Sequence, residues 1–184
     1  MMLFNLAMVI ALLLIAMVLQ PLWFMNGFAQ LQGARRVKNL PYDLDPRHKS
    51  DLYIPKHYDQ DKPVVVFVHG GAWDSGHKND YQFAGQAFAE MGYITQIPNY
   101  RLYPQAQFPH FIQDVATSIK ALPSQLRQCG LEVNNPLNVV LVGHSAGAHT
   151  VAMLATDSEF LKHVPVTVKA VIGMAGPYDL PLDD

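Results

Sequence analysis

The residues with the clearest chemical potential lie between 143 and 147, which read Gly-His-Ser-Ala-Gly and match the pattern G-x-S-x-G. A serine hydroxyl can act as a nucleophile when a strained turn between a strand and a helix lifts it clear of a sheet. An apolar run, Val139–Val142, precedes the motif, and a segment with helical spacing follows it. Gly143 and Gly147 suit so tight a turn, because a side chain at either position would collide with its neighbours. The motif therefore predicts Ser145 as a candidate nucleophile.

A second motif supplies the groups that such a nucleophile needs. Residues 69–73 read His-Gly-Gly-Ala-Trp and directly follow the apolar run Val64–Val68. Two adjacent glycines let backbone N–H groups turn toward a ligand without obstruction by side chains. In acyl transfer, these donors would hold the negative oxygen of the tetrahedral intermediate, together with the N–H of Ala146. The two motifs together predict acyl-transfer chemistry.

The elements that must position these motifs follow from hydrophobic patterning. Short apolar, β-branched runs predict buried strands at Val64–Val68, Tyr93–Pro98, Val139–Val142 and Val168–Met174. Segments with helical spacing lie between them, near Gln82–Met91, Phe111–Leu126 and Ala146–Ala155. The alternation predicts an α/β fold with a mostly parallel sheet flanked by helices. The segment Asp51–Ile54, closed by Pro55, predicts a strand that is part of an antiparallel edge of this sheet.

Composition excludes several classes of function. A net charge of −2 provides no basic field, so nucleic acid is not an expected partner. No phosphate-binding glycine signature follows the strands, so no nucleotide cofactor is expected. No metal is expected either, because His69, Asp74 and His77 lack a further positioned ligand. The single Cys129 cannot form an internal disulfide.

The amino terminus has a different composition from the rest of the chain. Residues 3–25 are almost entirely apolar and form a stretch of about the length needed to cross a bilayer as a helix. We expect residues 1–30 to be a membrane anchor, or alternatively a signal segment that is cleaved on export. The basic residues Arg35, Arg36 and Lys38 follow the run and favour a cytoplasmic domain, but leave its side weakly determined. Residues 31–40 are interpreted as a linker and 41–184 as the amino-terminal portion of the catalytic domain.

From about Asp45 to its last residue the chain resembles the α/β-hydrolase superfamily, and within it the esterases related to hormone-sensitive lipase and kynurenine formamidase. The resemblance is carried by Asp51–Pro55, the His69–Trp73 loop, Asn99–Leu102 with Pro104, Phe108–Pro109 with Asp114, the Gly143–Gly147 turn and Gly176–Asp179. It implies that Ser145 is the catalytic nucleophile and that the backbones of Gly71, Ala72 and Ala146 form the oxyanion hole.

The resemblance also implies supporting roles near these groups. His69 would brace the glycine loop beside Gly70, and Trp73 would form a wall of the acyl or alcohol pocket. Tyr100, Arg101 and Asp114 would be structural. The remaining histidines in this half of the chain are expected at the surface: His48, His57 and His110.

The match departs from the family where the rest of the catalytic triad should stand. Family members carry serine, acid and histidine in that order, and no histidine follows Asp179 in this chain. His149 lies one turn after Ser145 on the same helix and is expected to point along the helix flank rather than to act as the base. We therefore expect a fragment of a carboxylesterase-like serine hydrolase that is inactive alone and whose substrate is a small ester. The open alternatives are a formamidase of the same fold and a non-catalytic, membrane-anchored binding module.

Overall fold

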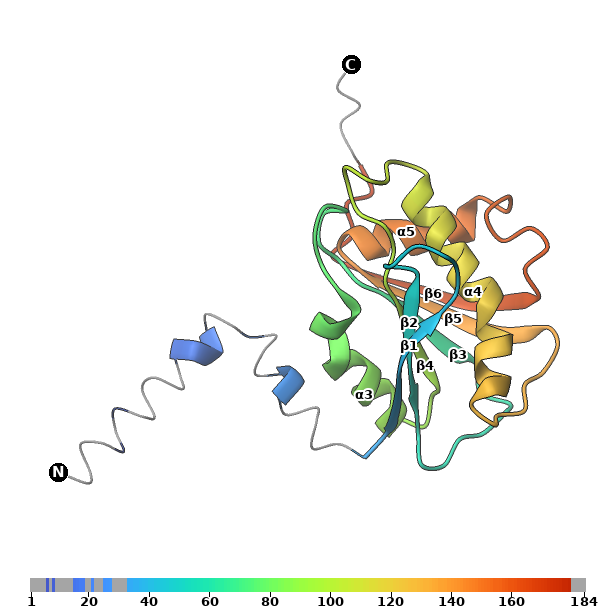
Figure 1. The fold of residues 1–184 in the computed structure, drawn as a ribbon, viewed down its shortest axis with the longest axis horizontal. Coiled ribbons are helices and arrows are strands. Elements are labelled where there is room, and N and C mark those ends of the chain that lie inside the picture. Colours follow the sequence, from blue (N-terminus) through green and yellow to red (C-terminus); the bar gives the residue numbers. More distant parts are fainter. Residues whose placement is uncertain are drawn as a thin grey trace, which may run out of the picture.

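The computed structural model describes residues 33–179, together with Leu6, Met8, Pro21 and residues 15–18 and 25–27. One six-stranded sheet, in the order β1-β2-β4-β3-β5-β6, forms the centre of the described domain (Figure 1). The strands are β1 (Arg35–Pro41), β2 (Lys49–Ile54), β3 (Val64–Val68), β4 (Thr95–Pro98), β5 (Leu137–His144) and β6 (Val166–Met174). The helices are the 3-10 helix η1 (Lys78–Tyr81), α3 (Gln82–Glu90), α4 (His110–Gln128) and α5 (Ala146–Thr156).

The strand pairing confirms the predicted fold class. β4, β3, β5 and β6 run parallel to one another, whereas β1 and β2 add to the sheet in antiparallel fashion. The four predicted parallel strands and three predicted helices all form, with ends shifted by only a few residues. Parallel neighbours bring the carboxyl ends of β3 and β5 to the same edge of the sheet, where the two sequence motifs begin.

At the other edge of the sheet one expectation is confirmed and one was wrong. The strand around Asp51–Ile54 is part of an antiparallel edge, since β2 pairs antiparallel with both β1 and β4. β1 in turn occupies much of the segment 31–40, which the sequence indicated as a linker. The reason is that β1 is an edge strand in which four of the seven residues are exposed, and only its Val37 and Leu40 pack against the core. Such a strand lacks the apolar run that marked the others.

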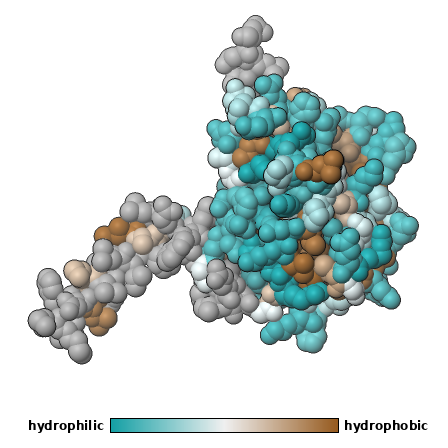
Figure 2. Space-filling model, viewed as in Figure 1, coloured by the Kyte–Doolittle hydropathy of each residue, from teal (hydrophilic) through white to brown (hydrophobic). Residues whose placement is uncertain are grey.

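Strand β3 is apolar throughout because helices cover both faces of the sheet. Val64, Val66 and Val68 of β3 belong to the core cluster that also holds side chains of α4 and α5. Val65 and Phe67 alternate with them and pack on the opposite face, where α3 lies. This alternation buries every side chain of β3. The surface of the described domain is largely hydrophilic in the view of Figure 2, with apolar side chains in separate patches.

A buried group of charges joins β1 to β2 and to η1. The carboxylate of Asp51, which is fully buried, lies 2.8 Å from the Lys78 ammonium and also pairs with the Arg36 guanidinium. Burial acts to raise the pKa of Asp51, but hydrogen bonds from Lys78, Asn39 and Arg36 outweigh it and hold the pKa below its ordinary value. The chain after the glycine loop is thereby tied to the two amino-terminal strands.

A second buried group holds the start of α4, and it corrects an expectation. His48 is not a surface residue: it is 5% exposed, and its Nε2 atom lies 3.1 Å from a carboxylate oxygen of Asp114. The same carboxylate accepts two hydrogen bonds from the Arg101 guanidinium, at 2.9 and 2.7 Å. His57 and His110 are exposed, as expected. His48 was misplaced because its buried position depends on a partner far along the chain.

The predicted membrane segment falls mainly outside the described residues. Across the part of the chain that the structure describes, no helix combines the length and the apolar character needed to cross a bilayer. Asn26, which directly follows the apolar run, contacts the domain: its side chain donates to the carbonyls of Asn79 and Asp80 and accepts from the N–H of Phe83. Asn26 is thus tied to η1 and to the start of α3.

Candidate active site

Ser145 occupies the turn between β5 and α5 in a strained backbone conformation. Its φ is 53° and its ψ is −121°, a region that residues with a side chain rarely adopt. The Ser145 N–H donates to the carbonyl of Met174 at 2.8 Å, which holds the turn against the end of β6. The serine is partly exposed, whereas Ala146 and Gly147 behind it are buried. The Ser145 side chain therefore points out of a turn whose next two residues are buried.

The glycine loop after β3 lies directly against this turn. Val68 and Gly143 are register partners in the parallel pair β3–β5, so the residues that follow them emerge side by side. A Cβ placed on Gly70 would lie 3.0 Å from the Cβ of Ser145. A Cβ on Gly147 would overlap the backbone carbonyl oxygen of Val68. The two loops can approach this closely only because glycine stands at both positions.

The backbone of the glycine loop turns its amides away from internal partners. Gly71, Ala72 and Trp73 all have positive φ, at 123°, 48° and 62°. The loop is closed by hydrogen bonds from the N–H groups of residues 74 and 75 to the Gly71 carbonyl. Within residues 33–179, no hydrogen bond is made by the N–H groups of Gly71, Ala72 and Ala146. These donors remain available to a ligand beside Ser145.

His69 lies beneath the loop and is uncharged at neutral pH. Burial lowers the pKa of its imidazole to about 4. Its Nδ1 atom lies 2.8 Å from the Gly70 carbonyl, so that nitrogen carries the proton and donates. The ring stacks on Tyr100 with 4.3 Å between ring centroids, and the Tyr100 hydroxyl donates to the His69 carbonyl at 2.9 Å. His69 thus contacts the glycine loop, and within the described residues its ring makes no hydrogen bond with the Ser145 side chain.

A largely apolar cavity of about 750 Å³ opens beside the turn. Aromatic side chains form most of its wall, with Trp73 and Phe111 in contact at 5.7 Å between centroids. His149 and Met153 contribute from α5, one and two turns beyond Ser145. The other lining residues are Ala72, Tyr103, Ala106, Gln107, Phe108, Tyr178 and Asp179. This cavity can hold an apolar group whose reacting atom lies beside the turn.

His149 takes part in the wall rather than in a hydrogen bond with the serine. Its ring lies edge-on to Trp73, with 5.4 Å between centroids, and burial lowers its pKa. Ring nitrogens of the described histidines form hydrogen bonds with Gly70, Asn79 and Tyr81, and none reaches the Ser145 hydroxyl. The described residues therefore bring together the serine, the glycine loop and the apolar wall, but place no base on the serine.

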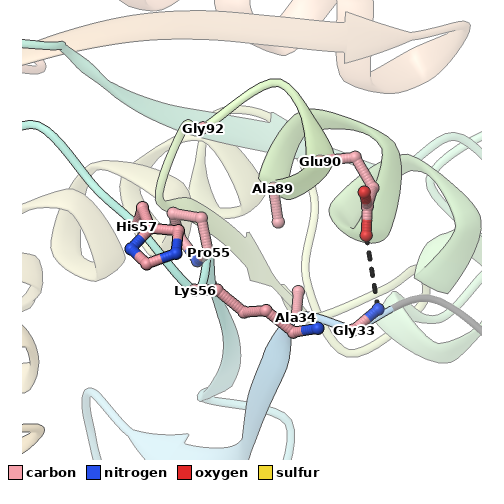
Figure 3. Close-up of a pocket in the computed structure, with 8 residues that line it drawn as sticks. All are labelled: Gly33, Ala34, Pro55, Lys56, His57, Ala89, Glu90 and Gly92. Atoms are coloured by element: carbon pink, nitrogen blue, oxygen red, sulfur yellow. Dashed lines mark hydrogen bonds between the residues drawn. The ribbon is translucent and has the colours of Figure 1, made fainter.

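A smaller cavity of about 280 Å³ lies at the opposite end of the sheet (Figure 3). It is bounded by the end of β2, the last turn of α3 and the residues before β1. Glu90 accepts a hydrogen bond from the Gly33 N–H at 3.3 Å, the Lys56 side chain extends to Gly33, and the His57 side chain lies on the far side (Figure 3). Because the smaller cavity lies far from the strand ends that carry the two motifs, the larger cavity is the candidate site.

The strained conformation of Ser145 leads to a prediction about stability that can be tested without measuring any activity. Glycine adopts positive φ without steric cost, so replacing Ser145 with glycine should relieve strain of about 1–3 kcal/mol, offset by about 0.5–1 kcal/mol of lost chain entropy. We expect Ser145→Gly to unfold at higher urea concentration than Ser145→Ala, with a free energy of unfolding larger by about 1 kcal/mol. Equal stability of the two variants would contradict the strained conformation.

The fold and the site together define a class of protein. A mostly parallel sheet flanked by helices, with a serine turn after β5 and a glycine loop after β3, is the α/β-hydrolase fold. Esterase B from Lactobacillus rhamnosis has this fold: its structure is 23% identical, covers 82% of this chain and 52% of its own, and superimposes with a TM-score of 0.66. A bacterial heroin esterase, at 22% identity, gives a TM-score of 0.57 over 73% of this chain and 42% of its own.

The family follows from the sequence comparison. The model of the BD-FAE family matches residues 50–183, and the chain belongs to this family. An isoprenylcysteine alpha-carbonyl methylesterase of Arabidopsis thaliana is 32% identical over 178 residues, which cover 93% of this chain and 41% of the relative. The kynurenine formamidase of Salmo salar is 26% identical over 156 residues, with coverages of 84% and 51%. The resemblance to esterases and kynurenine formamidase is thereby confirmed, and the chain spans about two fifths to one half of the length of these relatives.

Proposed function

We propose that this protein is a serine hydrolase that cleaves small carboxylic esters through an acyl-enzyme on Ser145. The observation that carries the proposal is the placement of Ser145 in a strained, outward-facing turn directly against a loop of unpaired backbone amides. Relatives named as methylesterases and formamidases support hydrolysis at a carbonyl carbon as the common chemistry.

In the proposed mechanism the Ser145 oxygen attacks the ester carbonyl and the alcohol leaves. The carbonyl oxygen becomes an oxyanion, which accepts hydrogen bonds from the N–H groups of Gly71, Ala72 and Ala146. These donors need no rearrangement, because positive φ angles already fix the loop. Water then releases the acid by attack on the acyl-enzyme, with the same groups holding the second oxyanion.

A general base must take the proton of Ser145, and the described residues do not supply it. In proteins of this fold a histidine and an acid on separate loops serve this role. We propose that the base and its acid come from outside residues 33–179. We therefore propose the activity for the full-length protein, which includes this base and its acid.

The apolar cavity sets the proposed substrate class. Aromatic side chains around about 750 Å³ favour an ester in which either the acyl or the alcohol part is apolar. The formamidase alternative shares every residue of the described site, and the formamidase relatives keep it open. A polar amide group gains less from this cavity than an apolar ester does, so esters are the first choice.

Covalent labelling tests the proposed nucleophile. The full-length protein should react with a fluorophosphonate probe, and mass spectrometry of its peptides should place the adduct on Ser145. Activity against p-nitrophenyl esters but not formamides would support the ester assignment, and activity confined to formamides would overturn it. A folded, full-length protein that neither reacts nor hydrolyses would favour the binding-module alternative.

A substitution in the cavity wall gives the substrate proposal a quantitative test. Met153→Trp should narrow the cavity without touching Ser145, since Met153 lies two turns along α5. We expect the ratio of kcat/KM for p-nitrophenyl hexanoate over acetate to fall by roughly tenfold or more, because each methylene excluded from such a pocket costs discrimination of that order. An unchanged ratio of kcat/KM for the two esters would indicate that the acyl group binds outside this cavity.

Residues 3–25 are proposed to hold the protein at a membrane. Their apolar length supports an uncleaved anchor, and the contacts of Asn26 with the start of α3 would keep the domain close to it. The full-length protein should then stay in the membrane pellet after a carbonate wash, and deletion of residues 3–25 should release it. An amino terminus found near residue 30 by sequencing would instead support export after signal cleavage.

A further inference from the structure

We infer that Tyr81 is a positioning residue, whose hydroxyl fixes the glycine loop to the serine turn and so holds the oxyanion donors in register with the nucleophile. The inference rests on the proposed function for its catalytic consequence. Tyr81 belongs to neither sequence motif, since it ends η1 and precedes α3. Its side chain nevertheless reaches both motifs.

Two hydrogen bonds carry the inference. The Gly70 N–H donates to the Tyr81 hydroxyl at 3.4 Å, and the same hydroxyl lies 2.8 Å from Nδ1 of His144. Gly70 is the residue before the proposed oxyanion donors, and His144 is the residue before the proposed nucleophile. One oxygen atom therefore bridges the two strand ends at the position where their loops leave the sheet.

The Tyr81 hydroxyl can serve both bonds at once. An N–H group can only donate, so the Tyr81 oxygen accepts from Gly70, and the same hydroxyl has a proton and a second lone pair for the bond with Nδ1 of His144. Burial raises the pKa of Tyr81, which keeps the hydroxyl protonated and able to donate at neutral pH.

The packing of the Tyr81 ring gives its hydroxyl a fixed position. Tyr81 is 8% exposed, and its ring packs against Phe67 of β3 at 5.3 Å and Phe83 of α3 at 5.9 Å between centroids. Because the Tyr81 hydroxyl accepts a hydrogen bond from the Gly70 N–H, that amide is not available to a ligand. The amides that remain available are those of the residues that follow Gly70. Small displacements matter here, because a shift of about 1 Å in a catalytic group can cost about 100-fold in rate.

Tyr53 supplies a matched control for removing a buried tyrosine hydroxyl. It is fully buried on the same face of the sheet as Tyr81, and its hydroxyl has no hydrogen-bond partner in the described part of the chain. Tyr81→Phe and Tyr53→Phe each delete one buried oxygen and leave the ring packing intact. Only the first deletes a link between the two loops.

The decisive experiment measures kinetics and NMR spectra of both variants in the full-length protein. With p-nitrophenyl acetate we expect Tyr81→Phe to lower kcat by roughly 10- to 100-fold with KM unchanged, less than loss of a direct oxyanion donor, and Tyr53→Phe to leave both within about twofold. In ¹⁵N spectra, Tyr81→Phe should shift the Gly70 amide and Nδ1 of His144, and Tyr53→Phe should not.

The outcomes separate this inference from the proposed function. A wild-type protein that hydrolyses esters and a Tyr81→Phe variant with equal kcat would overturn the positioning role and leave the proposed function intact. A rise in KM alone would also overturn it, because it would assign Tyr81 to substrate binding. If the wild type hydrolyses nothing, the proposed function fails and the positioning role with it, and the ¹⁵N shifts then report only on the hydrogen-bond bridge.

Discussion

Replacement of Ser145 with alanine is expected to lower kcat/KM for ester hydrolysis by roughly 10⁴- to 10⁶-fold in the full-length protein. In the proposed mechanism the loss is large because the acyl-enzyme cannot form without the serine oxygen, while a residual rate would come from the proposed oxyanion donors and substrate binding. The substitution removes one oxygen from a partly exposed side chain and retains the backbone turn, so the fold should persist. Steady-state kinetics with p-nitrophenyl acetate measure the effect.

Ser158 provides the control for this substitution. It is an exposed serine in the segment after α5, away from the turn at Ser145. Ser158→Ala should match the wild type in kcat/KM within about twofold, since isolated surface substitutions have small effects. An activity loss below about tenfold in Ser145→Ala, with Ser158→Ala unchanged, would show that the reaction proceeds through another group.

The largest effect on stability is expected from Asp51→Ala, which should reduce the free energy of unfolding by about 3–5 kcal/mol. The variant would leave the buried ammonium of Lys78, whose side chain is 3% exposed, without its counter-ion, and would free the Arg36 guanidinium. Since whole domains are stable by only about 5–15 kcal/mol, this single change should move the urea midpoint strongly.

The exposed ion pair Lys162–Glu159 gives a matched comparison. Its side chains are 55% and 70% exposed, so Glu159→Ala should cost no more than about 0.5 kcal/mol. If Asp51→Ala does not fold, Asp51→Asn keeps the shape and still accepts the hydrogen bond from Asn39, and should lose a smaller part of the stability. Costs for Asp51→Asn and Glu159→Ala that are equally small would contradict a role of Asp51 in holding the strands.

The depressed pKa of Asp51 also fixes the sign of the dependence on pH. A carboxyl with a lower pKa in the folded than in the unfolded state stabilises the fold above the unfolded value, and this contribution is lost as the pH falls through the folded value. The wild type should therefore lose stability progressively below about pH 5. Asp114 acts in the same direction, because hydrogen bonds from Arg101 and His48 outweigh its burial and lower its pKa.

Much of the fold could be predicted because the central strands and helices leave recognisable patterns among neighbouring residues. β3 is a continuous β-branched run, buried on both faces, and its observed bounds, Val64–Val68, are those predicted. The turn at Ser145 lies between a strand and a helix, as its motif indicated. Such elements are encoded by neighbouring residues, since burial on both faces and helical spacing leave a pattern within a few positions.

Other features depended on contacts between distant residues. The segment around Arg36 forms an edge strand only because β2 offers it a partner and Asp51 pairs with its charge. His48 is buried because Asp114, 66 residues further along the chain, lies against it. No local pattern distinguishes such polar side chains from surface ones, because their burial is compensated by partners that the chain brings together only on folding.

The sequence by itself determined the sheet of parallel strands, the candidate serine and the glycine loop. The tertiary structure decided what surrounds them: Phe111 and Met153, which join Trp73 in the apolar wall, and the hydroxyl of Tyr81 between Gly70 and His144. The physical reason is that conformation within an element is set by local sterics and burial, whereas the meeting of side chains is set by strand register and helix packing.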